Sequence, residues 1–539
     1  MKSRLRLATS VFALLAACSA PAALRLPAIF SEHMVLQQNL ATPIWGWDTP
    51  GQKVMVTFAG EKHMTHADEN GKWRVVLEPR AASTTPATLT VTGSTKVSVG
   101  DVLVGEVWIC SGQSNMQFRL EESYTGDIEA AASNFSDLRL ITVPTKGTQE
   151  LQTDFKGEWV EATPTTARKF SAVGYMFGRY LHQILDVPVG VINVSWGGSA
   201  AEAWVRRYSL EQDPRFREMT EDAAKKEVQL STPEAQAKLE ADTKAWEAGR
   251  KNGAPWAPRP TDWLKGNQRP GNLFAGMLNP IVGYGLKGAI WYQGEANAAR
   301  AAQYADLFPF LIEQWRKEWG QGDFPFYWVQ LADHKPETDN PGADSGWARL
   351  RESQTKTLRL PNTGQAVAID IGEGRDIHPR DKYNVAARLV RWALVRDYDM
   401  KFPYRSPEFK SVEFTGAKAL VTFDCFGGQL YAFDDPTVRG FAVCGADKVW
   451  HWAKGTIRGK DQVEVSSDEV PAPVAVRYAF ADNPRCNLYA RSGLPATPFR
   501  TDDFPPITAP APVEQPVTPT PPATTTQPAT PAPTPSSQP

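Results

Sequence analysis

The run from Val102 to Cys110 is almost entirely apolar and rich in β-branched residues. Such a run without alternation is typical of a strand buried on both faces, as in the centre of a parallel sheet. Gly112-Gln113-Ser114-Asn115 follows directly. This order predicts that the Ser114 hydroxyl lies at the carboxyl edge of a sheet, where open α/β sheets bind ligands. A helix starting there would direct the positive end of its dipole at the hydroxyl and favour an alkoxide-like transition state.

The segment from about residue 99 to 400 repeats this rhythm of strand, loop and helix, which is typical of a doubly wound α/β domain. We expect further strands and two long helices, with a charged, Ala-rich helical insertion at about 206–265 near the active-site side. The expected strands are Val189–Val194, Ala289–Tyr292, Phe326–Leu331 and Ala366–Ile371, and the expected helices are Ala298–Trp319 and Tyr383–Val395.

Two flanking segments, 24–98 and 401–503, contain short alternating runs between turn residues and are predicted to be all-β domains, the first of them a small β-sandwich. In the first, Lys53–Phe58 and Thr88–Thr92 are expected strands, and Asn70-Gly71 is a hairpin signal. The predicted fold is therefore an α/β domain between two β domains.

The amino-terminal segment 1–23 has a cationic start and a short apolar core from Leu7 to Ala17, which is typical of a signal peptide. Leu15-Ala16-Ala17-Cys18 resembles a bacterial lipobox, which would leave Cys18 lipidated. Ordinary cleavage near Ala20 to Ala22 is the alternative. Both predict an exported protein, in the periplasm, at the outer membrane or outside the cell. Segment 504–539 is rich in Pro, Thr and Ala and is predicted to be disordered.

The length and charge of the chain limit the classes of function it can have. With 539 residues the chain should form two to four domains, and a net charge of −2 without a basic stripe argues against nucleic-acid binding. Cys110 is expected to be an inert core thiol, whereas one pair among Cys425, Cys444 and Cys486 could form a disulfide. The histidines of His63-Met64-Thr65-His66 are expected to lie on the surface rather than to bind a metal.

Several predicted strands are followed by loops with an unusual polar residue. Ser114 is a candidate nucleophile, and Gly197-Gly198 would let a backbone amide approach a small reacting group closely. Gln293 and Asn297 could donate hydrogen bonds, and His378 is a candidate base. A hydroxyl, a base and donors for an oxyanion are the set that ester hydrolysis requires. His334, which also follows a predicted strand, is the runner-up base.

Four sequence blocks resemble, in order, those of the sialate O-acetylesterase family, which belongs to the SGNH-hydrolase superfamily. The resemblance extends over nearly the whole chain between the signal segment and the tail, with further similar stretches at 269–274 and 493–502. The four blocks are Trp108-Ile109-Cys110-Ser111-Gly112-Gln113-Ser114-Asn115-Met116, Trp196-Gly197-Gly198, Trp291-Tyr292-Gln293-Gly294-Glu295-Ala296-Asn297 and Asp376-Ile377-His378-Pro379.

The resemblance implies a fold and a mechanism. It implies an SGNH-hydrolase-like sheet in which Ser114 attacks an acetyl carbonyl and His378 moves the proton, without metal or cofactor. The oxyanion would be bound by the amides of Ser114 and Gly198 with the side chain of Gln293 or Asn297.

The acid that orients the histidine is left open by the resemblance. The superfamily often has an Asp three residues before the His, but here that position is Arg375. Asp376 is the first choice for the acid, with Glu295 and Glu373 as alternatives, and a Ser–His dyad would need none.

We therefore expect a carbohydrate O-acetylesterase that acts on an acetylated sugar or polysaccharide. Sialic acid and plant polysaccharides such as xylan both fit. A carbohydrate-binding surface protein that no longer turns over is the alternative from another class, and a lipase or peptidase on the same scaffold is a third. The sequence leaves the oligomeric state open.

Overall fold

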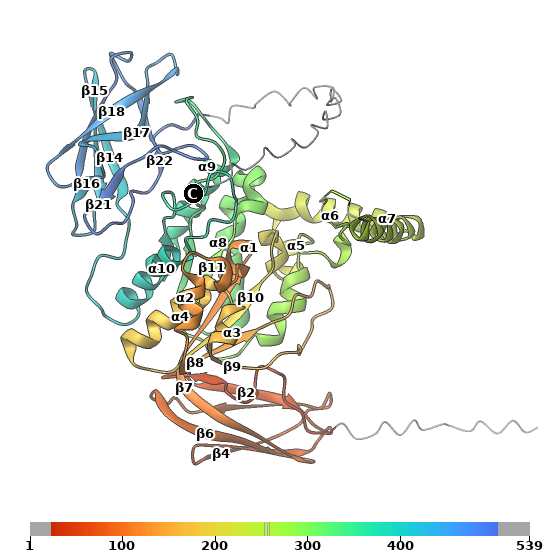
Figure 1. The fold of residues 1–539 in the computed structure, drawn as a ribbon. Coiled ribbons are helices and arrows are strands. Elements are labelled where there is room, and N and C mark those ends of the chain that lie inside the picture. The colour runs from red at the N-terminus through yellow and green to blue at the C-terminus, as the bar shows by residue number, and fades with distance from the viewer. Residues whose placement is uncertain (1–22, 253, 256, 258, 505–539) are drawn as a thin grey trace, which may run out of the picture. The chain divides into compact units, whose positions relative to one another are not determined.

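The computed structural model describes residues 23–252, 254–255, 257 and 259–504 (Figure 1). The predicted lipidation of Cys18 and the predicted disorder of the tail concern segments outside the described residues, as does the expected signal peptide apart from Ala23. None of the described helices combines the length and the apolar character that crossing a membrane would require.

A mainly parallel sheet forms the centre of the protein and confirms the prediction of a mixed α/β fold. Its order is β13-β12-β11-β7-β10-β8-β9, and every neighbouring pair is parallel except β8 and β9. The strands are β7 (Lys96–Gly112), β8 (Phe135–Thr142), β9 (Val160–Ala162), β10 (Val189–Ser195), β11 (Gly288–Tyr292), β12 (Phe326–Val329) and β13 (Thr363–Ala366).

Strand β7 shows why its sequence is so apolar. Val107 and Ile109 belong to the apolar core on one face of the sheet, whereas Trp108 and Cys110 belong to the core on the other face. The helices α8 and α9 supply residues to the first core, and α4 and α10 to the second. The helices are α4 (Ala172–Leu185), α8 (Ala301–Trp319), α9 (Gly346–Lys356) and α10 (Lys382–Arg396), with the shorter α1 (Ser114–Gln117), α2 (Gly126–Ala131) and α3 (Pro164–Arg168).

The first β segment is joined to this sheet through β7 itself. The first part of β7 pairs with β6 and β1, and its last part pairs with β10 and β11. The strands are β1 (Val35–Gln37), β2 (Thr42–Trp47), β3 (Lys53–Phe58), β4 (Glu61–His66), β5 (Lys72–Leu77) and β6 (Ser83–Thr92). The expected hairpin at Asn70-Gly71 is wrong, because the turn joins β4 to β5, which pair with β3 and β2 respectively.

The second β segment is an antiparallel sheet in the order β14-β15-β19-β18-β17-β20-β22, beside a small pair β16-β21. The strands are β14 (Glu408–Thr415), β15 (Lys418–Asp424), β16 (Leu430–Ala432), β17 (Thr437–Cys444), β18 (Trp450–Arg458), β19 (Gln462–Ser466), β20 (Ala475–Tyr478), β21 (Leu488–Ala490) and β22 (Phe499–Arg500). The four cysteines of the described chain, Cys110, Cys425, Cys444 and Cys486, are free thiols.

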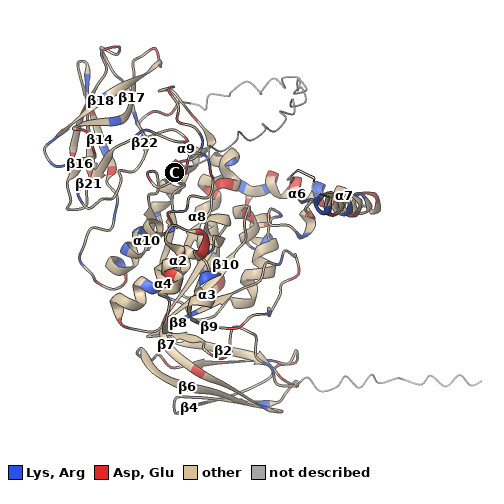
Figure 2. Cartoon of the chain, in the orientation of Figure 1, with Lys and Arg blue, Asp and Glu red and all other residues tan. Residues whose placement is uncertain are grey.

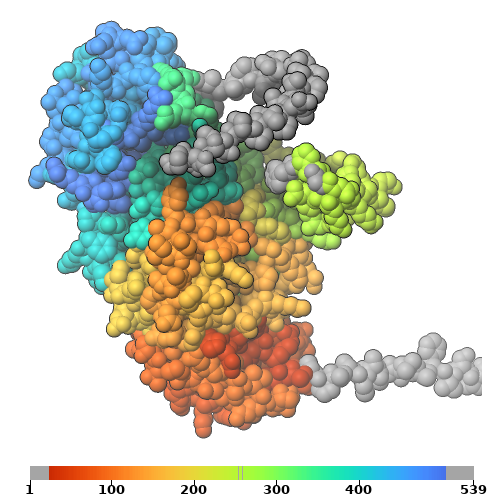
Figure 3. Space-filling view, viewed as in Figure 1, coloured from red at the N-terminus to blue at the C-terminus, as the bar shows by residue number. Residues whose placement is uncertain are grey.

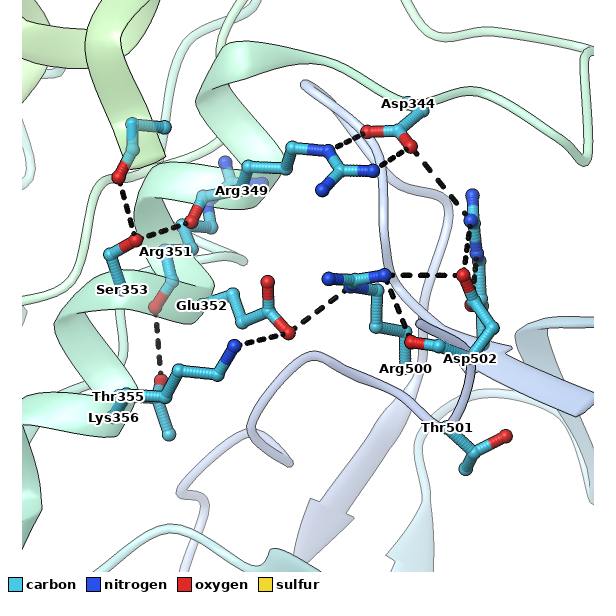
Figure 4. Close-up of polar contacts among 12 residues, drawn as sticks. Asp344, Arg349, Arg351, Glu352, Ser353, Thr355, Lys356, Arg500, Thr501 and Asp502 are labelled. Carbon is cyan, nitrogen blue, oxygen red and sulfur yellow. Dashed lines mark hydrogen bonds and ion pairs between the residues drawn. The ribbon is translucent and has the colours of Figure 1, made fainter. Parts of the chain in front are cut away.

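Ion pairs and a buried arginine fasten this segment to α9. Arg500 bonds to Glu352 and Asp502, and Glu352 also pairs with Lys356 (Figure 4). Arg351 is fully buried, and its guanidinium donates to the carbonyls of Leu331, Ala332, Ala481 and Asp482. Because carbonyls from both segments converge on one guanidinium, this contact is fixed by geometry as well as by charge.

The expected strand Ala366–Ile371 is displaced toward the amino terminus. Strand β13 ends at Ala366, which pairs with Val329, the last residue of β12. The run that follows is apolar for another reason. Val367 and Ile369 are buried in the core of the second β segment, whereas Ala368 belongs to a core of the central sheet. An apolar run that joins two cores therefore resembled a strand.

The insertion is helical, as expected. Helix α7 has no buried residue, carries charges of both signs along its length (Figure 2), and stands out as the yellow-green part of Figure 3. The insertion contains α5 (Arg207–Gln212), α6 (Arg217–Leu230) and α7 (Pro233–Lys251). The short 3₁₀- and π-helical elements of the described residues are η1 (Leu120–Glu122), η2 (Ala201–Trp204), η3 (Pro214–Phe216), η4 (Trp263–Lys265), η5 (Phe274–Leu278), η6 (Asn279–Ile281), η7 (Glu295–Arg300) and η8 (Thr357–Arg359).

Candidate active site

Ser114 lies where β7 ends, between the ends of β10 and β11. Gly112 allows the turn, because its φ is +136° and a Cβ there would lie 2.1 Å from the Tyr292 carbonyl oxygen. The following helix α1 has a single turn and ends at Gln117. The helix dipole expected at Ser114 is therefore small, and the site depends on individual N–H groups instead.

His378 lies in the loop between β13 and α10 and meets Ser114 across the carboxyl edge of the sheet. The distance from His378 Nε2 to Ser114 Oγ is 2.8 Å, a hydrogen bond between residues 264 positions apart. The strand order changes direction at β7, since β8 and β10 lie on one side and β11 to β13 on the other. Open α/β sheets have their ligand crevice at such a point.

The pair faces an open pocket of about 460 Å³. Its described lining is Ser114, Gln117, Phe118, Arg119, Glu122 and His378. The pocket thus combines one aromatic face and one hydroxyl with a histidine and an ion pair, and a small polar ester could reach the hydroxyl from solvent.

Of the three carboxylates considered for the acid, Asp376 contacts the histidine. Its Oδ1 lies 3.5 Å from His378 Nδ1 and accepts the backbone N–H of His378 at 2.9 Å. Glu373 instead accepts the backbone N–H of Arg380, and Glu295 accepts a bond from Asn115. Arg375 is exposed. At 3.5 Å Asp376 interacts with the ring mainly through its charge rather than through a tight hydrogen bond.

Burial lowers the pKa of His378 below its ordinary value near 6.5. The charge of Asp376 raises this pKa, whereas the charges of Lys382 and His334 lower it. The imidazole is therefore mainly neutral at pH 7, which is the form that can accept a proton from a hydroxyl.

Two backbone N–H groups could serve as oxyanion donors, one on Ser114 itself and one on the Gly197-Gly198 turn that lies against Ser114. Within the described residues, the amides of Ser114 and Gly198 donate to no acceptor. Gly198 has a φ of +72°, which favours glycine, and the turn before it is close to the nucleophile, since a Cβ on Gly197 would lie 3.3 Å from Ser114 Cβ. Gln117 Oε1 accepts the Gly197 N–H at 2.8 Å and fixes this turn.

Gln293 and Asn297 lie beneath this turn rather than on the pocket wall. Gln293 Nε2 donates to the Ser199 carbonyl and to Asn297 Oδ1, so both of its N–H groups are engaged. Asn297 Nδ2 donates to Glu202, and Asn297 Oδ1 also accepts from Ala201 N. Both side chains are buried, and in this arrangement they hold the backbone around Gly198.

The runner-up base lies outside the Ser114–His378 pair. The His334 ring packs against Trp347, and its backbone N–H bonds to the Asp482 carbonyl. Of the two histidines in His63-Met64-Thr65-His66, His63 pairs with a carboxylate of its own β segment, since its Nε2 lies 2.9 Å from Glu61 Oε2.

Two buried residues of the site, Asn115 and Lys382, were not among the predicted functional residues. Asn115 stands directly after the nucleophile, and Lys382 begins α10, four positions after His378. A lysine at the first position of a helix opposes the helix dipole. That conflict is the one signal in the sequence that could have drawn attention to Lys382.

One family model and several known proteins are similar to this chain. The family model described as carbohydrate esterase, sialic acid-specific acetylesterase matches residues 260–386. The sialate O-acetylesterase of Mus musculus is 30% identical over 535 residues, covering 89% of this chain and 95% of the mouse protein. The Homo sapiens protein of the same name is 29% identical, covering 89% of this chain and 93% of its own.

A solved structure is similar over the same extent. The carbohydrate acetylesterase from Xanthomonas citri is 38% identical, with a TM-score of 0.76, covering 89% of this chain and all of that one.

Proposed function

Because the chain belongs to the sialate O-acetylesterase family, we propose that it is a carbohydrate O-acetylesterase that works through an acetyl-enzyme on Ser114. The observation that supports this mechanism best is the 2.8 Å contact between Ser114 Oγ and a His378 whose pKa is lowered by burial. A neutral imidazole in that position can accept the hydroxyl proton as the oxygen attacks.

The first half of the reaction forms the acetyl-enzyme. Ser114 Oγ bonds to the acetyl carbonyl carbon while His378 Nε2 accepts the hydroxyl proton. The charge that develops on the carbonyl oxygen is bound by the N–H groups of Ser114 and Gly198, and each such donor is worth about 3 kcal/mol. The bond to the sugar oxygen then breaks, and His378 returns the proton to that oxygen.

The second half repeats these steps with water. His378 accepts a proton from a water molecule as the water oxygen attacks the acetyl carbon. The bond to Ser114 Oγ then breaks, His378 returns the proton to that oxygen, and acetate leaves. The charge of Asp376 stabilises the imidazolium in both halves. Gln293 and Asn297, which the family resemblance offered as direct donors, instead keep the Gly198 turn in place.

We also assign the sheet to the SGNH-hydrolase type. The change of strand direction at β7, with Ser114, Gly198 and His378 on loops at one edge, supports this assignment. The chain departs from the superfamily at the position three residues before His378. An Asp is common there, but this chain has the exposed Arg375.

The charge of the pocket bears on which acetylated glycan is hydrolysed. Arg119 is the one cation in its described lining, and it pairs with Glu121 at 3.0 Å and with Glu122 at 2.6 Å. A sialic acid carries a carboxylate that would have to compete with Glu121 and Glu122 for this arginine, whereas a neutral acetylated polysaccharide would not. The charge of the pocket therefore supports a neutral acetylated polysaccharide as a second candidate substrate beside sialic acid.

Two measurements test these proposals. Purified protein and Ser114→Ala are compared on p-nitrophenyl acetate, and equal rates would reject the serine mechanism. Acetate release is then compared between O-acetylated sialic acid and acetylated xylan at equal acetyl concentration. Activity on the sialic acid alone would reject a neutral polysaccharide as substrate.

Export is proposed from the cationic and apolar pattern of segment 1–23. Mass spectrometry of the protein from its native cell envelope would give the mature amino terminus. A start at Cys18 with added acyl mass indicates a lipoprotein, a start near residue 21 indicates ordinary cleavage, and an intact Met1 contradicts export by this route.

A further inference from the structure

Asn115 faces away from the pocket and reaches the loop that carries His378. It is buried, and its Nδ2 donates to the Ile377 carbonyl at 2.9 Å and to Glu295 Oε1 at 2.6 Å. The residue after the nucleophile is thus bonded to the residue before the histidine. This contact crosses from the end of β7 to the segment before α10.

Lys382 makes the matching contact on the other side of the histidine. Its Nζ donates to Asn115 Oδ1 at 2.7 Å and to the carbonyl of Pro379, and it lies over the rings of Phe118 and Tyr292 at 4.7 and 5.5 Å. The side chain is fully buried. Two carbonyls that flank His378, those of Ile377 and Pro379, are therefore held by one connected pair of side chains.

We propose that Asn115 and Lys382 form a clamp that positions His378 opposite Ser114. This inference rests on the proposed serine mechanism and adds two positioning residues to it. The clamp holds the Ile377 carbonyl, in the peptide directly before His378, and the Pro379 carbonyl one peptide beyond it. The backbone from which the imidazole projects is therefore fixed on both sides, which favours the side-chain position opposite Ser114 Oγ. Such preorganisation matters because displacement by about 1 Å can lower a rate on the order of 100-fold.

Nearby carboxylates partly compensate for the burial of the Lys382 ammonium group. Burial lowers the pKa of Lys382 to about 7, and the negative charges of Glu295, Glu373 and Asp376 oppose that change. Burial also raises the pKa of Glu295, whose Oε2 has no hydrogen-bond partner within the described residues. The two groups thus face each other through the Asn115 amide, which bonds to both.

A purely structural role for Lys382 would be surprising on local grounds. Lys382 is the first residue of α10, after the capping residue Asp381, and a cation is unfavourable at that end of a helix. A residue that contradicts its local preference and still makes specific bonds is expected at functional sites more than elsewhere.

The test compares Lys382→Met with Lys317→Met, the same change at an exposed position of α8. For Lys382→Met on p-nitrophenyl acetate we expect kcat to fall 10- to 100-fold with KM within about twofold, whereas Lys317→Met should match the parent. In addition, loss of the nearby cation should raise the pKa of His378, so the acid limb of the pH–rate profile should move to higher pH. Parent-like kcat and an unmoved acid limb in folded Lys382→Met would overturn the proposal.

A second variant guards against a Lys382→Met protein that does not fold. Asn115→Asp keeps the acceptor for Lys382 but has no N–H for the Ile377 carbonyl, and we expect at least a tenfold lower kcat. A parent-like kcat in that variant would overturn the clamp by itself.

Failure of the clamp and failure of the serine mechanism give different results. If Ser114→Ala abolishes hydrolysis while both clamp variants behave like the parent, only the clamp is rejected. If Ser114→Ala hydrolyses ester as fast as the parent, the serine mechanism itself falls.

Discussion

The site consists of two layers of side chains, one partly exposed to the pocket and one largely buried beneath it. The reacting layer, Ser114, His378 and Asp376, is partly exposed, with side-chain exposures of 37% for His378 and 47% for Asp376. The support layer consists of the buried Asn115, Gln293, Asn297 and Lys382 together with Glu295. Its polar groups are hydrogen-bonded to one another and to the backbone, except Glu295 Oε2, which has no partner within the described residues.

Neighbouring residues often belong to different layers, as Ser114 and Asn115 do. The difference teaches that chemistry and stability are separable here. Changes in the reacting layer should lower the rate with little effect on folding, whereas changes in the support layer should affect both.

The largest loss of rate should come from His378→Gln. If this variant also destabilised the protein, the separation between a reacting layer and a support layer would be wrong. Without a general base we expect kcat to fall by about 10⁴-fold, because removal of a nucleophile's base costs on this scale in serine hydrolases. The melting temperature should stay within a few degrees of the parent. Initial rates on p-nitrophenyl acetate and circular dichroism melting measure the two quantities.

Gly198→Ala should have the next largest effect. At a φ of +72° an alanine is strained, and the turn should shift the Gly198 N–H away from the developing oxyanion. We expect kcat to fall by about 100-fold, in line with the loss of one oxyanion donor. Gly283→Ala is the matched control, since Gly283 also has positive φ with open space around it. Equal rates for the two variants would argue against Gly198 as a donor.

Gln293→Leu tests the support layer and should change both quantities. It leaves the buried Ser199 carbonyl without its donor, whereas Asn297 Oδ1 keeps the Ala201 N–H. The unsatisfied carbonyl costs about 1–3 kcal/mol of unfolding free energy. We expect a lower urea midpoint together with a roughly tenfold lower kcat. A variant with parent-like unfolding and a 1,000-fold rate loss would instead place Gln293 in the reacting layer.

Asp376→Asn should have a modest effect, because the carboxylate lies 3.5 Å from His378 Nδ1 and is nearly half exposed. We expect kcat to fall by about tenfold or less. The charge of Asp376 raises the pKa of His378, so its removal should move the acid limb of the pH–rate profile to lower pH. A 1,000-fold loss would show that Asp376 is indispensable for orienting the ring.

The pH dependence of the parent should show the smallest effect. The neutral form of His378 is active and its folded pKa is lowered, so kcat/KM should reach half its plateau below pH 6.5. The same sign applies to stability. Protonation is harder in the folded than in the unfolded state, so stability is lost as the pH falls below about 6.5. A half-maximum above pH 7 would contradict this assignment.

Much of the fold could be predicted from periodicity. The strand around Val102–Cys110, the strands at Val189 and Ala289 and the helix over Tyr383–Val395 lie where the sequence places them, because each buries a continuous face. The predicted helix from Ala298 begins instead within the 3₁₀-helical segment η7 and becomes α-helical at Ala301.

The errors had a common origin in tertiary context. The turn at Asn70-Gly71 forms, but which strands pair across it depends on the second layer of the β segment. The run from Val367 to Ile371 is buried between cores rather than paired in a sheet. Neither outcome is encoded locally.

The site shows the same limit. Motifs indicated Ser114 and His378, but the layer to which each polar neighbour belongs depends on where its side chain points. The engagement of Gln293 with Ser199 could not be seen in the sequence, and neither could the burial of Lys382.

Strand β7 carries one more consequence. Its 17 residues begin in the first β sheet and end two positions before the nucleophile, so a single backbone belongs to both halves. No hinge separates them, and no cut between them would leave the enzyme half with an intact central strand. Recombination that swaps this amino-terminal half for another would therefore have to preserve the entire strand, whereas the α7 protrusion offers a far safer place to graft foreign sequence.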